Sequence, residues 1–442
     1  MVSARFPETS LAPDAVFAEM EDARRNDVDW RRGRLGLYVH FGGDDVLAVA
    51  KEAYLRFFSE NALGPKAFPS LLKFENDLVA WTADLLNAGP NATGVVTSGG
   101  TESIFLAVKT ARDHARAQRP AIKAPEIVAP ISAHPAFDKA AHYLCMKVTR
   151  VPLRADFRAD VPAMAAAITP NTIMVVGSAP SFPHGMIDPI TDLAALARDQ
   201  DLWMHVDACV GGFLAPFVRR LGYPVPPFDF AVDGVQSMSA DLHKYGFTAK
   251  GASVMLLRDQ ALRKYLIFEF DNWPRGKYTA PTFGGSRPGG AIAAAWAVMR
   301  YLGVEGYLRI AQQIMGARDR VMRGIAAIDG LYVIGTPELS VMGYAASDPP
   351  PGRPKAGAPS GGRTPQADLG GDYLDIFAVA EQLTQKGWFV STMSEPPGIH
   401  MGMPTLAHVA IVDEYLADLA AAVAAVRANH LTSHSHEVTY GE

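Results

Sequence analysis

From about residue 93 the chain alternates short β-rich runs with helical segments, and no other feature constrains its fold as much. The β-rich runs lie at residues 93–98, 126–130, 172–179, 202–208, 234–240 and 252–257. Helical patterns fit between several of them, as at 103–118 and 190–200. This alternation predicts an α/β fold with a mainly parallel sheet flanked by helices on both faces. A functional site in such a sheet is expected at the carboxyl ends of its strands.

The length of 442 residues exceeds what one small core accommodates, so we expect more than one structural unit. Residues 1–58 are predicted to form an N-terminal helical segment, and residues 59–290 the large domain. Residues 291–442 are predicted to form a smaller α+β C-terminal domain. Within it, residues 347–371 are rich in Pro and Gly and lack large apolar side chains, which predicts a flexible surface loop.

Charge and cysteine content narrow the class of protein. The formal net charge is −5 and there is no Lys/Arg-rich run, so a nucleic-acid partner is not expected. Only Cys145 and Cys209 occur, which favours a reducing compartment and makes the cytoplasm the expected location. A membrane span is not expected, because no run of about 18 apolar residues occurs.

Three polar motifs follow predicted strands. TSGGTES (97–103) opens a helix, where free backbone N–H groups bind anions, although many such turns are only tight turns. Asp207 ends the strand in HVDAC (205–209) and could pair with a cationic ring nitrogen, or equally serve as a helix cap or a buried polar partner. Lys244 follows the next strand beside His243 and could form a Schiff base, although a lone lysine is usually a solvated surface residue.

Together these three motifs match the needs of one cofactor, pyridoxal 5'-phosphate. Its phosphate suits the start of a helix, its ring nitrogen suits an aspartate, and its aldehyde reacts with a lysine. The coincidence in one sheet is far more specific than each motif alone. We therefore expect a pyridoxal-phosphate enzyme.

Six motifs carry a resemblance to a known family: TSGGTES (97–103), EIVAPISAHPAFDKAA (126–141), FPHGMIDPI (182–190), HVDACVGGFL (205–214), SADLHKYG (239–246) and GSRPGG (285–290). With these motifs the chain resembles the sphingosine-1-phosphate lyases, which belong to the fold-type-I pyridoxal-phosphate enzymes related to the group II decarboxylases. The resemblance implies a large domain with a mainly parallel, seven-stranded type of sheet and a smaller α+β domain.

The resemblance also implies roles for particular residues. Lys244 would bind the cofactor covalently, Asp207 would pair with its ring nitrogen, and His134 would stack on the ring. The cofactor phosphate would be held by Gly100, Thr101, His243 and, from the neighbouring subunit, Ser286. That last role implies a homodimer with shared active sites.

On the substrate side, the resemblance implies that Lys250 contacts a substrate phosphate and that Tyr38, in GRLGLYVHFGG (33–43), is an active-site tyrosine. Phe182 would also lie there, where some bacterial members carry a tyrosine. His205 could pack beside the cofactor or be an ordinary buried histidine.

The implied reaction is retro-aldol cleavage of the C2–C3 bond in a phosphorylated sphingoid base, giving a long-chain aldehyde and phosphoethanolamine. Lys244, Tyr38 and the substrate phosphate remain alternatives for the group that moves the protons. The rival interpretations are an L-amino-acid decarboxylase with the same cofactor and a catalytically silent scaffold. The presence of both Lys244 and Asp207 argues against the scaffold.

Two further sequence features concern a departure from the family pattern near the N-terminus and the histidines of the C-terminal tail. NALGPKAFP (61–69) has Gly64 where the resemblance implies a histidine, and the loss of that side chain would either weaken binding of the substrate phosphate or alter proton transfer. His430, His434 and His436 lie in a polar tail and do not predict a metal site.

Overall fold

The computed structural model describes residues 6–36, 38–348, 373–402, 405–433, 435 and 438. Its helices are α1 (Pro13–Ala23), α2 (Asp44–Arg56), α3 (Pro69–Leu85), α4 (Gly100–Gln118), α5 (Ala136–Tyr143), α6 (Val161–Ala166), α7 (Ile190–Asp199), α8 (Ala215–Arg220), α9 (Arg263–Leu266), α10 (Gly289–Ala327), α11 (Ile376–Gln385) and α12 (Leu406–Ala428). Its strands are β1 (Thr93–Thr97), β2 (Glu126–Pro130), β3 (Lys147–Val151), β4 (Thr172–Ser178), β5 (Trp203–Asp207), β6 (Val235–Ala240), β7 (Ser253–Leu257), β8 (Phe268–Phe270), β9 (Tyr278–Ala280), β10 (Leu331–Val333), β11 (Val341–Ala346), β12 (Ser391–Ser394) and β13 (Pro397–Gly402).

A seven-stranded sheet in the order β1-β7-β6-β5-β4-β2-β3 forms the large domain, in which β7 runs antiparallel to both of its neighbours and the other pairs are parallel. This confirms the predicted fold class and all six predicted strands. The edge strand β3 was not predicted, because its residues are mostly half-buried or exposed and show no buried run.

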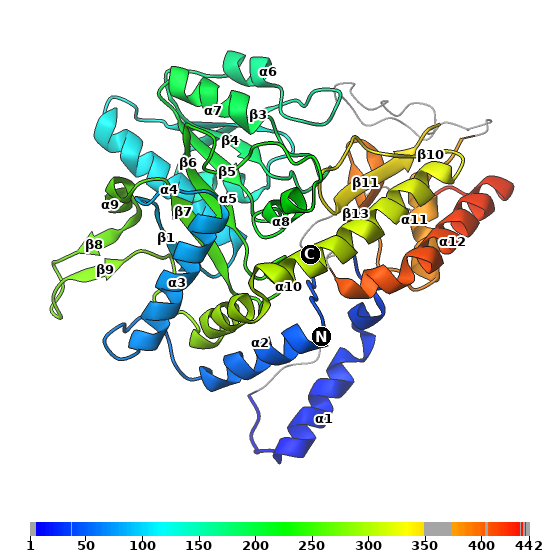
Figure 1. Ribbon diagram of the computed structural model, residues 1–442, viewed down its shortest axis with the longest axis horizontal. Helices are drawn as coiled ribbons and strands as arrows, with labels where there is room; N and C mark the ends of the chain where they lie inside the picture. Colours follow the sequence, from blue (N-terminus) through cyan, green and yellow to red (C-terminus); the bar gives the residue numbers. More distant parts are fainter. Residues whose placement is uncertain are drawn as a thin grey trace.

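Successive side chains of a strand point to opposite faces of the sheet, and this alternation divides the interior into two hydrophobic cores. In β2, Ile127 packs in the core that includes α4 and α5, whereas the next residue, Val128, packs in the core that includes α3, α7, α8 and α10. Because both faces of the sheet are covered by helices (Figure 1), every residue of β2 is buried. The resulting rigid sheet holds the strand ends that carry the site.

The second sheet has the order β10-β11-β13-β12 and is antiparallel throughout. Helix α10 leads from the large sheet toward it (Figure 1) and contains a non-helical break at Gly303. The predicted flexible loop lies largely outside the described residues. Among the described helices, none combines the length and apolar character that crossing a membrane requires.

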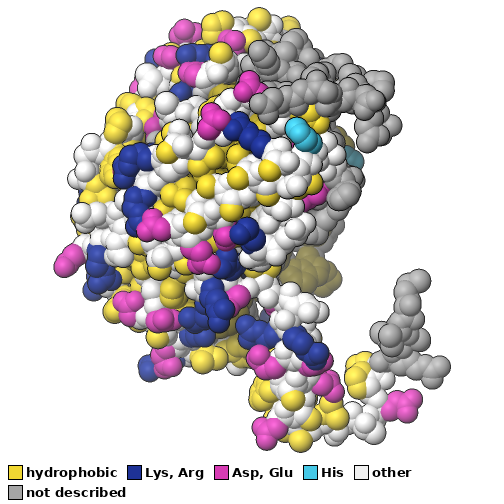
Figure 2. Space-filling model, turned by 90° about the vertical axis from the view of Figure 1, so that its right-hand side faces the viewer, with side chains coloured by type: hydrophobic (Ala, Val, Ile, Leu, Met, Phe, Trp, Pro, Cys, Tyr) yellow, Lys and Arg dark blue, Asp and Glu magenta, His cyan; other side chains and the backbone are white. Residues whose placement is uncertain are grey.

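The N-terminal arm, residues 6–23, stands away from the body of the molecule (Figures 1 and 2). No residue of its helix α1 is buried. The arm nevertheless carries large apolar side chains that are more than 40% exposed, namely Phe6, Leu11, Val16, Phe17 and Met20. These exposed apolar side chains distinguish the arm from the rest of the described chain, where most large apolar side chains are buried.

Candidate active site

A cavity of about 640 Å³ lies at the carboxyl ends of the large-sheet strands, where it also reaches residues of the small sheet. Its walls include Tyr38, His40, Ser98, Gly100, Thr101, Glu102, His134, Phe182, Asp207, Cys209, Asp241, His243, Lys244 and Lys250. The structure therefore brings together most of the residues that the sequence indicated.

The turn between β1 and α4 forms an anion cradle. Within the described part of the chain, the backbone N–H groups of Gly100, Thr101 and Glu102 have no hydrogen-bond partner. A Cβ atom at Gly100 would lie 2.8 Å from both Asp241 Oδ2 and Cys209 Sγ, so a side chain there would clash with buried groups. Free donors at the start of a long helix suit a phosphate.

Asp207 ends β5 with one oxygen occupied and one available. Its Oδ1 accepts hydrogen bonds from the Cys209 N–H (3.0 Å) and from Ser239 Oγ (3.2 Å). Its Oδ2 has no hydrogen-bond partner among the described residues. The side chain is 8% exposed and lines the cavity. A buried carboxylate that is held in one orientation in this way is well placed to pair with a protonated ring nitrogen.

Lys244 lies one turn after β6 and forms an ion pair with Asp241, with Nζ and Oδ2 3.0 Å apart. Burial alone would lower the pKa of Lys244, but the charge of Asp241 outweighs it and raises the pKa above the ordinary lysine value. Burial would likewise raise the pKa of Asp241, yet the charges of Lys244 and His243 hold it below its ordinary value. Asp241 was not singled out from the sequence, although its spacing of three residues before Lys244 is a usable signal.

His243 and His134 are both held by backbone N–H groups. His243 Nδ1 accepts from the Ala252 N–H at 3.3 Å, and His134 Nδ1 accepts from the Ala136 N–H at 3.1 Å. Burial lowers the pKa of His243 to about 4, against the opposing charge of Asp241. Burial also lowers the pKa of His134, against the charge of Asp207. Both rings are therefore neutral at pH 7 and face the cavity as uncharged groups.

Lys250 lies in the same cavity, where its Nζ donates to the His243 carbonyl at 3.1 Å. Although the residue as a whole is solvent-exposed, partial burial of the ammonium and then the charge of Lys244 lower its pKa to about 8. An ammonium group whose pKa is lowered by a neighbouring cation is stabilised in its charged form when an anionic ligand binds beside it.

Three predicted site residues occupy different surroundings. His205 does not line the cavity: it is fully buried behind Asp207, with Nδ1 2.8 Å from Ser237 Oγ and Nε2 3.4 Å from Ser239 Oγ. Ser286 is exposed and does not line this chain's cavity. Tyr38 does line it, but is 49% exposed and adopts a left-handed backbone conformation (φ 67°).

Gly64, the position at which the resemblance implied a histidine, does not line the cavity. The nearest atom to a Cβ built there is Ala67 Cβ at 3.7 Å, so a side chain would fit. The missing histidine therefore does not reflect a steric conflict within this chain.

Comparisons with known proteins agree with this geometry. The family model of the pyridoxal-dependent decarboxylase conserved domain matches residues 39–339. The sphingosine-1-phosphate lyase of Oryza sativa is 42% identical over 94% of this chain and 73% of its own length. The lyase of Rattus norvegicus is 39% identical over 96% of this chain and 70% of its own length.

Among solved structures, the sphingosine-1-phosphate lyase of Burkholderia pseudomallei matches with a TM-score of 0.87 and 35% identity, covering 97% of this chain and 94% of that one. The glutamate decarboxylase of Lactobacillus brevis matches with a TM-score of 0.81 at 20% identity, covering 98% of this chain and 97% of that one, which shows a shared fold. The fold and the site thus define a fold-type-I, pyridoxal-phosphate-dependent enzyme. Within that class, the chain belongs to the sphingosine-1-phosphate lyase family.

The site residues fit this cofactor. The N–H groups at the start of α4 would hold its phosphate, Asp207 its ring nitrogen, and Lys244 its aldehyde carbon. When bound, the cofactor accepts the electron pair that bond cleavage leaves on the substrate. The protein must then orient the substrate, exclude water and move protons.

Proposed function

We propose that this enzyme cleaves phosphorylated sphingoid bases between C2 and C3, giving a long-chain aldehyde and phosphoethanolamine. The observation that carries the proposal is the pairing of two cations in one cavity, with Lys244 at the cofactor position and Lys250 beside it. Lys250 suits a second, distal phosphate, because a substrate of this class is a dianion near neutral pH. The family relationship supports the same substrate.

The decisive assay incubates the holoenzyme with sphingosine 1-phosphate and, separately, with L-amino acids. We expect a long-chain aldehyde and phosphoethanolamine in the first reaction and no carbon dioxide in the second. Release of carbon dioxide from an amino acid without any aldehyde formation would replace the proposal with a decarboxylase.

The role of Lys250 predicts a pH effect on substrate affinity. Lys250→Ala should raise the KM for the phosphorylated substrate about 10-fold to 100-fold, the value of a hydrogen bond between charged groups, while the absorption of the bound cofactor persists. In the wild type, KM should rise above about pH 8 as Lys250 loses its proton. Lys250→Arg should keep KM flat in that range, because arginine remains charged.

Lys123 provides the matched control, because it is exposed, lines neither cavity and donates to the Pro120 carbonyl. Lys123→Ala should leave KM at its wild-type value. An unchanged KM in Lys250→Ala would refute the phosphate contact.

A second cavity, of about 290 Å³, shares His134 and Phe182 with the first and opens between the large and small sheets. Its apolar lining includes Ile131, Pro183 and Met393. Because it adjoins the cofactor site and is mostly apolar, we propose that it receives the hydrocarbon chain of the substrate.

Ile131→Asp tests this placement, since Ile131 is 41% exposed and a charge there is compatible with folding. We expect KM to rise about tenfold for an 18-carbon substrate, equivalent to a loss of about two buried methylene groups, and to change little for an 8-carbon substrate. Val304→Asp is the control, since Val304 is 48% exposed and lines neither cavity. Equal effects on both chain lengths would reject the placement.

We further propose a homodimer with shared active sites. The exposed apolar residues of the N-terminal arm and the exposed position of Ser286 support it. The dimer should sediment at twice the chain mass of 47.5 kDa, and the pair of substitutions Phe17→Glu and Met20→Glu should weaken it.

Mixing inactive variants tests whether the sites are shared. Lys244→Ala and Ser286→Asp homodimers should each be nearly inactive, but mixed dimers should regain activity, since one of their two sites is then free of both substitutions. Mixed dimers that remain inactive would argue against shared sites.

We propose a cytoplasmic location, supported by the unpaired state of both Cys145 and Cys209.

A further inference from the structure

A short N-terminal strap, residues 34–36 and 38–41, is fastened to the small domain beside the active site. The Phe389 N–H donates to the Arg34 carbonyl at 2.9 Å, and the Leu406 N–H donates to the Phe41 carbonyl at 2.9 Å. His408 Nε2 lies 3.0 Å from the Leu35 carbonyl oxygen. Contacts at both ends therefore hold the strap in place.

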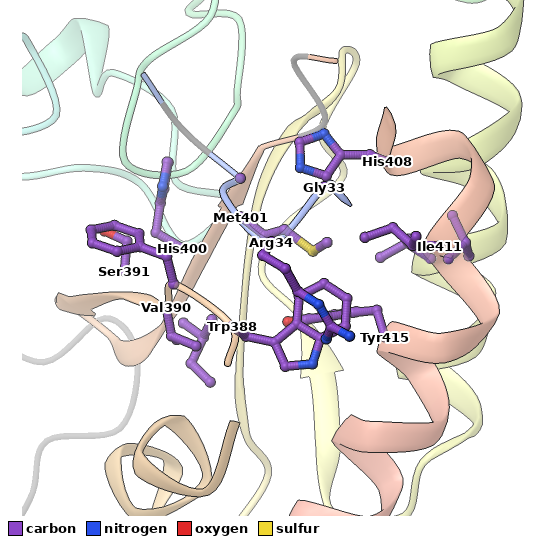
Figure 3. A pocket seen from close by; sticks show the side chains of 15 residues that line it. Gly33, Arg34, Trp388, Val390, Ser391, His400, Met401, His408, Ile411 and Tyr415 are labelled. Carbon is purple, nitrogen blue, oxygen red and sulfur yellow. The ribbon is translucent and has the colours of Figure 1, made fainter. Parts of the chain in front are cut away.

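The Arg34 side chain strengthens this attachment. Its guanidinium lies 4.1 Å from the centre of the Trp388 ring and pairs with Glu414. Figure 3 shows Arg34 beside Trp388 and Tyr415 around a small cavity of about 30 Å³. The strap is therefore a fixed platform, and any side chain that it directs into the active site has a defined position.

His40 is such a side chain. It lines the catalytic cavity together with Lys244 and Lys250. Its ring packs edge-on against Tyr245, with centroids 5.0 Å apart, and Tyr245 is itself fixed by a 2.6 Å hydrogen bond to Ser340 Oγ. The position of His40 is therefore set by the strap on one side and by the lysine-bearing turn on the other.

Among the three histidines that line the cavity, His40 differs in its hydrogen bonding. His134 and His243 each accept a backbone N–H at Nδ1. His40 Nδ1 is buried and has no hydrogen-bond partner among the described residues. This nitrogen is therefore not committed to any described protein donor, and the ring that carries it belongs to a residue that lines the site.

The charges around His40 keep it neutral. Burial lowers its pKa well below the ordinary value, and the positive charges of Lys250 and Lys244 lower it further. Within the described residues no carboxylate counters this shift, so the imidazole is uncharged at pH 7. Binding of a phosphate dianion beside Lys250 would partly neutralise these cations and raise the proton affinity of His40 when the substrate is present.

We propose that His40 accepts the proton of the substrate C3 hydroxyl as the C2–C3 bond breaks, an inference that rests on the proposed lyase function. The O–H electron pair becomes the second bond of the aldehyde carbonyl, and the C2–C3 pair stays on C2, which is protonated afterwards. No oxidant or reductant is required. Of the other candidates, Tyr38 is half exposed and Lys244 is a cation paired with Asp241.

The test compares His40→Ala, His40→Gln and the wild type. Both variants should lose about 10²- to 10³-fold in kcat, the range for a general base, with KM within threefold and an unchanged cofactor absorption band. The acid limb of the kcat–pH profile should disappear, and added imidazole should partly restore His40→Ala. In the cofactor-free protein, the NMR titration of His40 should show a ring that remains neutral well below pH 6.5.

His430→Asn, at an exposed histidine outside the site, should match the wild type throughout. Wild-type kcat in His40→Gln would overturn the role of His40, as would loss of activity that leaves the acid limb in place and does not respond to imidazole. Should His40→Ala lose the cofactor band, His40→Gln decides alone. Absence of aldehyde formation by the wild type would instead reject the lyase function, so the two failures are distinguishable.

Discussion

Asp207→Asn is expected to leave the fold and the bound cofactor intact and to lower kcat about 10²- to 10³-fold, the usual cost of removing one well-placed electrostatic contact. Asparagine retains an oxygen that can accept from the Cys209 N–H and Ser239 Oγ. It replaces the second carboxylate oxygen with an N–H₂ group, which cannot stabilise a protonated ring nitrogen. The cofactor ring then withdraws electrons less strongly from the breaking bond.

The measurement is kcat for sphingosine 1-phosphate together with the cofactor absorption spectrum. Ser239→Ala is the matched control, because it removes one hydrogen bond to Asp207 but keeps the carboxylate. We expect a loss below about tenfold in that variant. Similar losses in the two variants would mean that Asp207 acts mainly through its orientation and not through its charge.

Lys244→Ala should have a still larger effect on turnover, about 10⁴-fold or more, because Lys244 is the cavity lysine that we expect to bind the cofactor covalently, whereas Lys250 is expected to contact the substrate phosphate. Borohydride should attach the cofactor to the wild-type chain and not to the variant, as measured by intact mass. Lys250→Ala, six residues later, should still be labelled. Labelling of Lys244→Ala would refute the assignment.

Lys244→Ala should also lower the free energy of unfolding of the cofactor-free protein. Asp241 is 2% exposed and pairs with Lys244, so the variant leaves a buried carboxylate without its cation, at a cost of about 1–3 kcal/mol in the free energy of unfolding. Adding Asp241→Asn should recover part of that stability and none of the turnover. Urea denaturation of the cofactor-free forms measures this.

The ion pair also has a defined pH dependence. Because the pKa of Asp241 is lowered on folding, its contribution is present above the ordinary aspartate pKa and is lost as the pH falls. Because the pKa of Lys244 is raised, its contribution is present below the ordinary lysine pKa and is lost as the pH rises beyond it. The stability difference between wild type and Lys244→Ala should therefore be largest between about pH 5 and 9 and shrink in acid.

The strands of the large sheet could be predicted because each is a short, buried, β-rich run with turn residues at its ends. Residues 126–130 coincide with β2, and the other five predicted strands agree with the structure to within a residue at each end. The residues that we expect to bind the cofactor could be singled out for the same reason. Asp207 ends a strand, Gly100 and Lys244 each follow one, and strand ends of one sheet converge.

His40 could not be assigned in this way, whereas Asp241 was missed although its spacing from Lys244 is a usable signal. His40 lies in an irregular segment about 200 residues before Lys244, and its placement depends on hydrogen bonds to Phe389 and Leu406 at the far end of the chain. His205 shows the opposite case. Its position two residues before Asp207 places it on the same face of β5, but Ser237 and Ser239 enclose it.

The sequence by itself determined the sheet and the cofactor and singled out Lys244 as the expected covalent lysine, because these depend on local patterns of strand, turn and helix start that recur wherever such a sheet forms. Only the tertiary structure decided which histidine of the catalytic cavity has an unpartnered Nδ1, which carboxylate pairs with Lys244, and where a second, mostly apolar cavity lies. Those features arise from segments brought together across hundreds of residues, and their hydrogen bonds, burial and charge exist only once the two domains and the strap are packed.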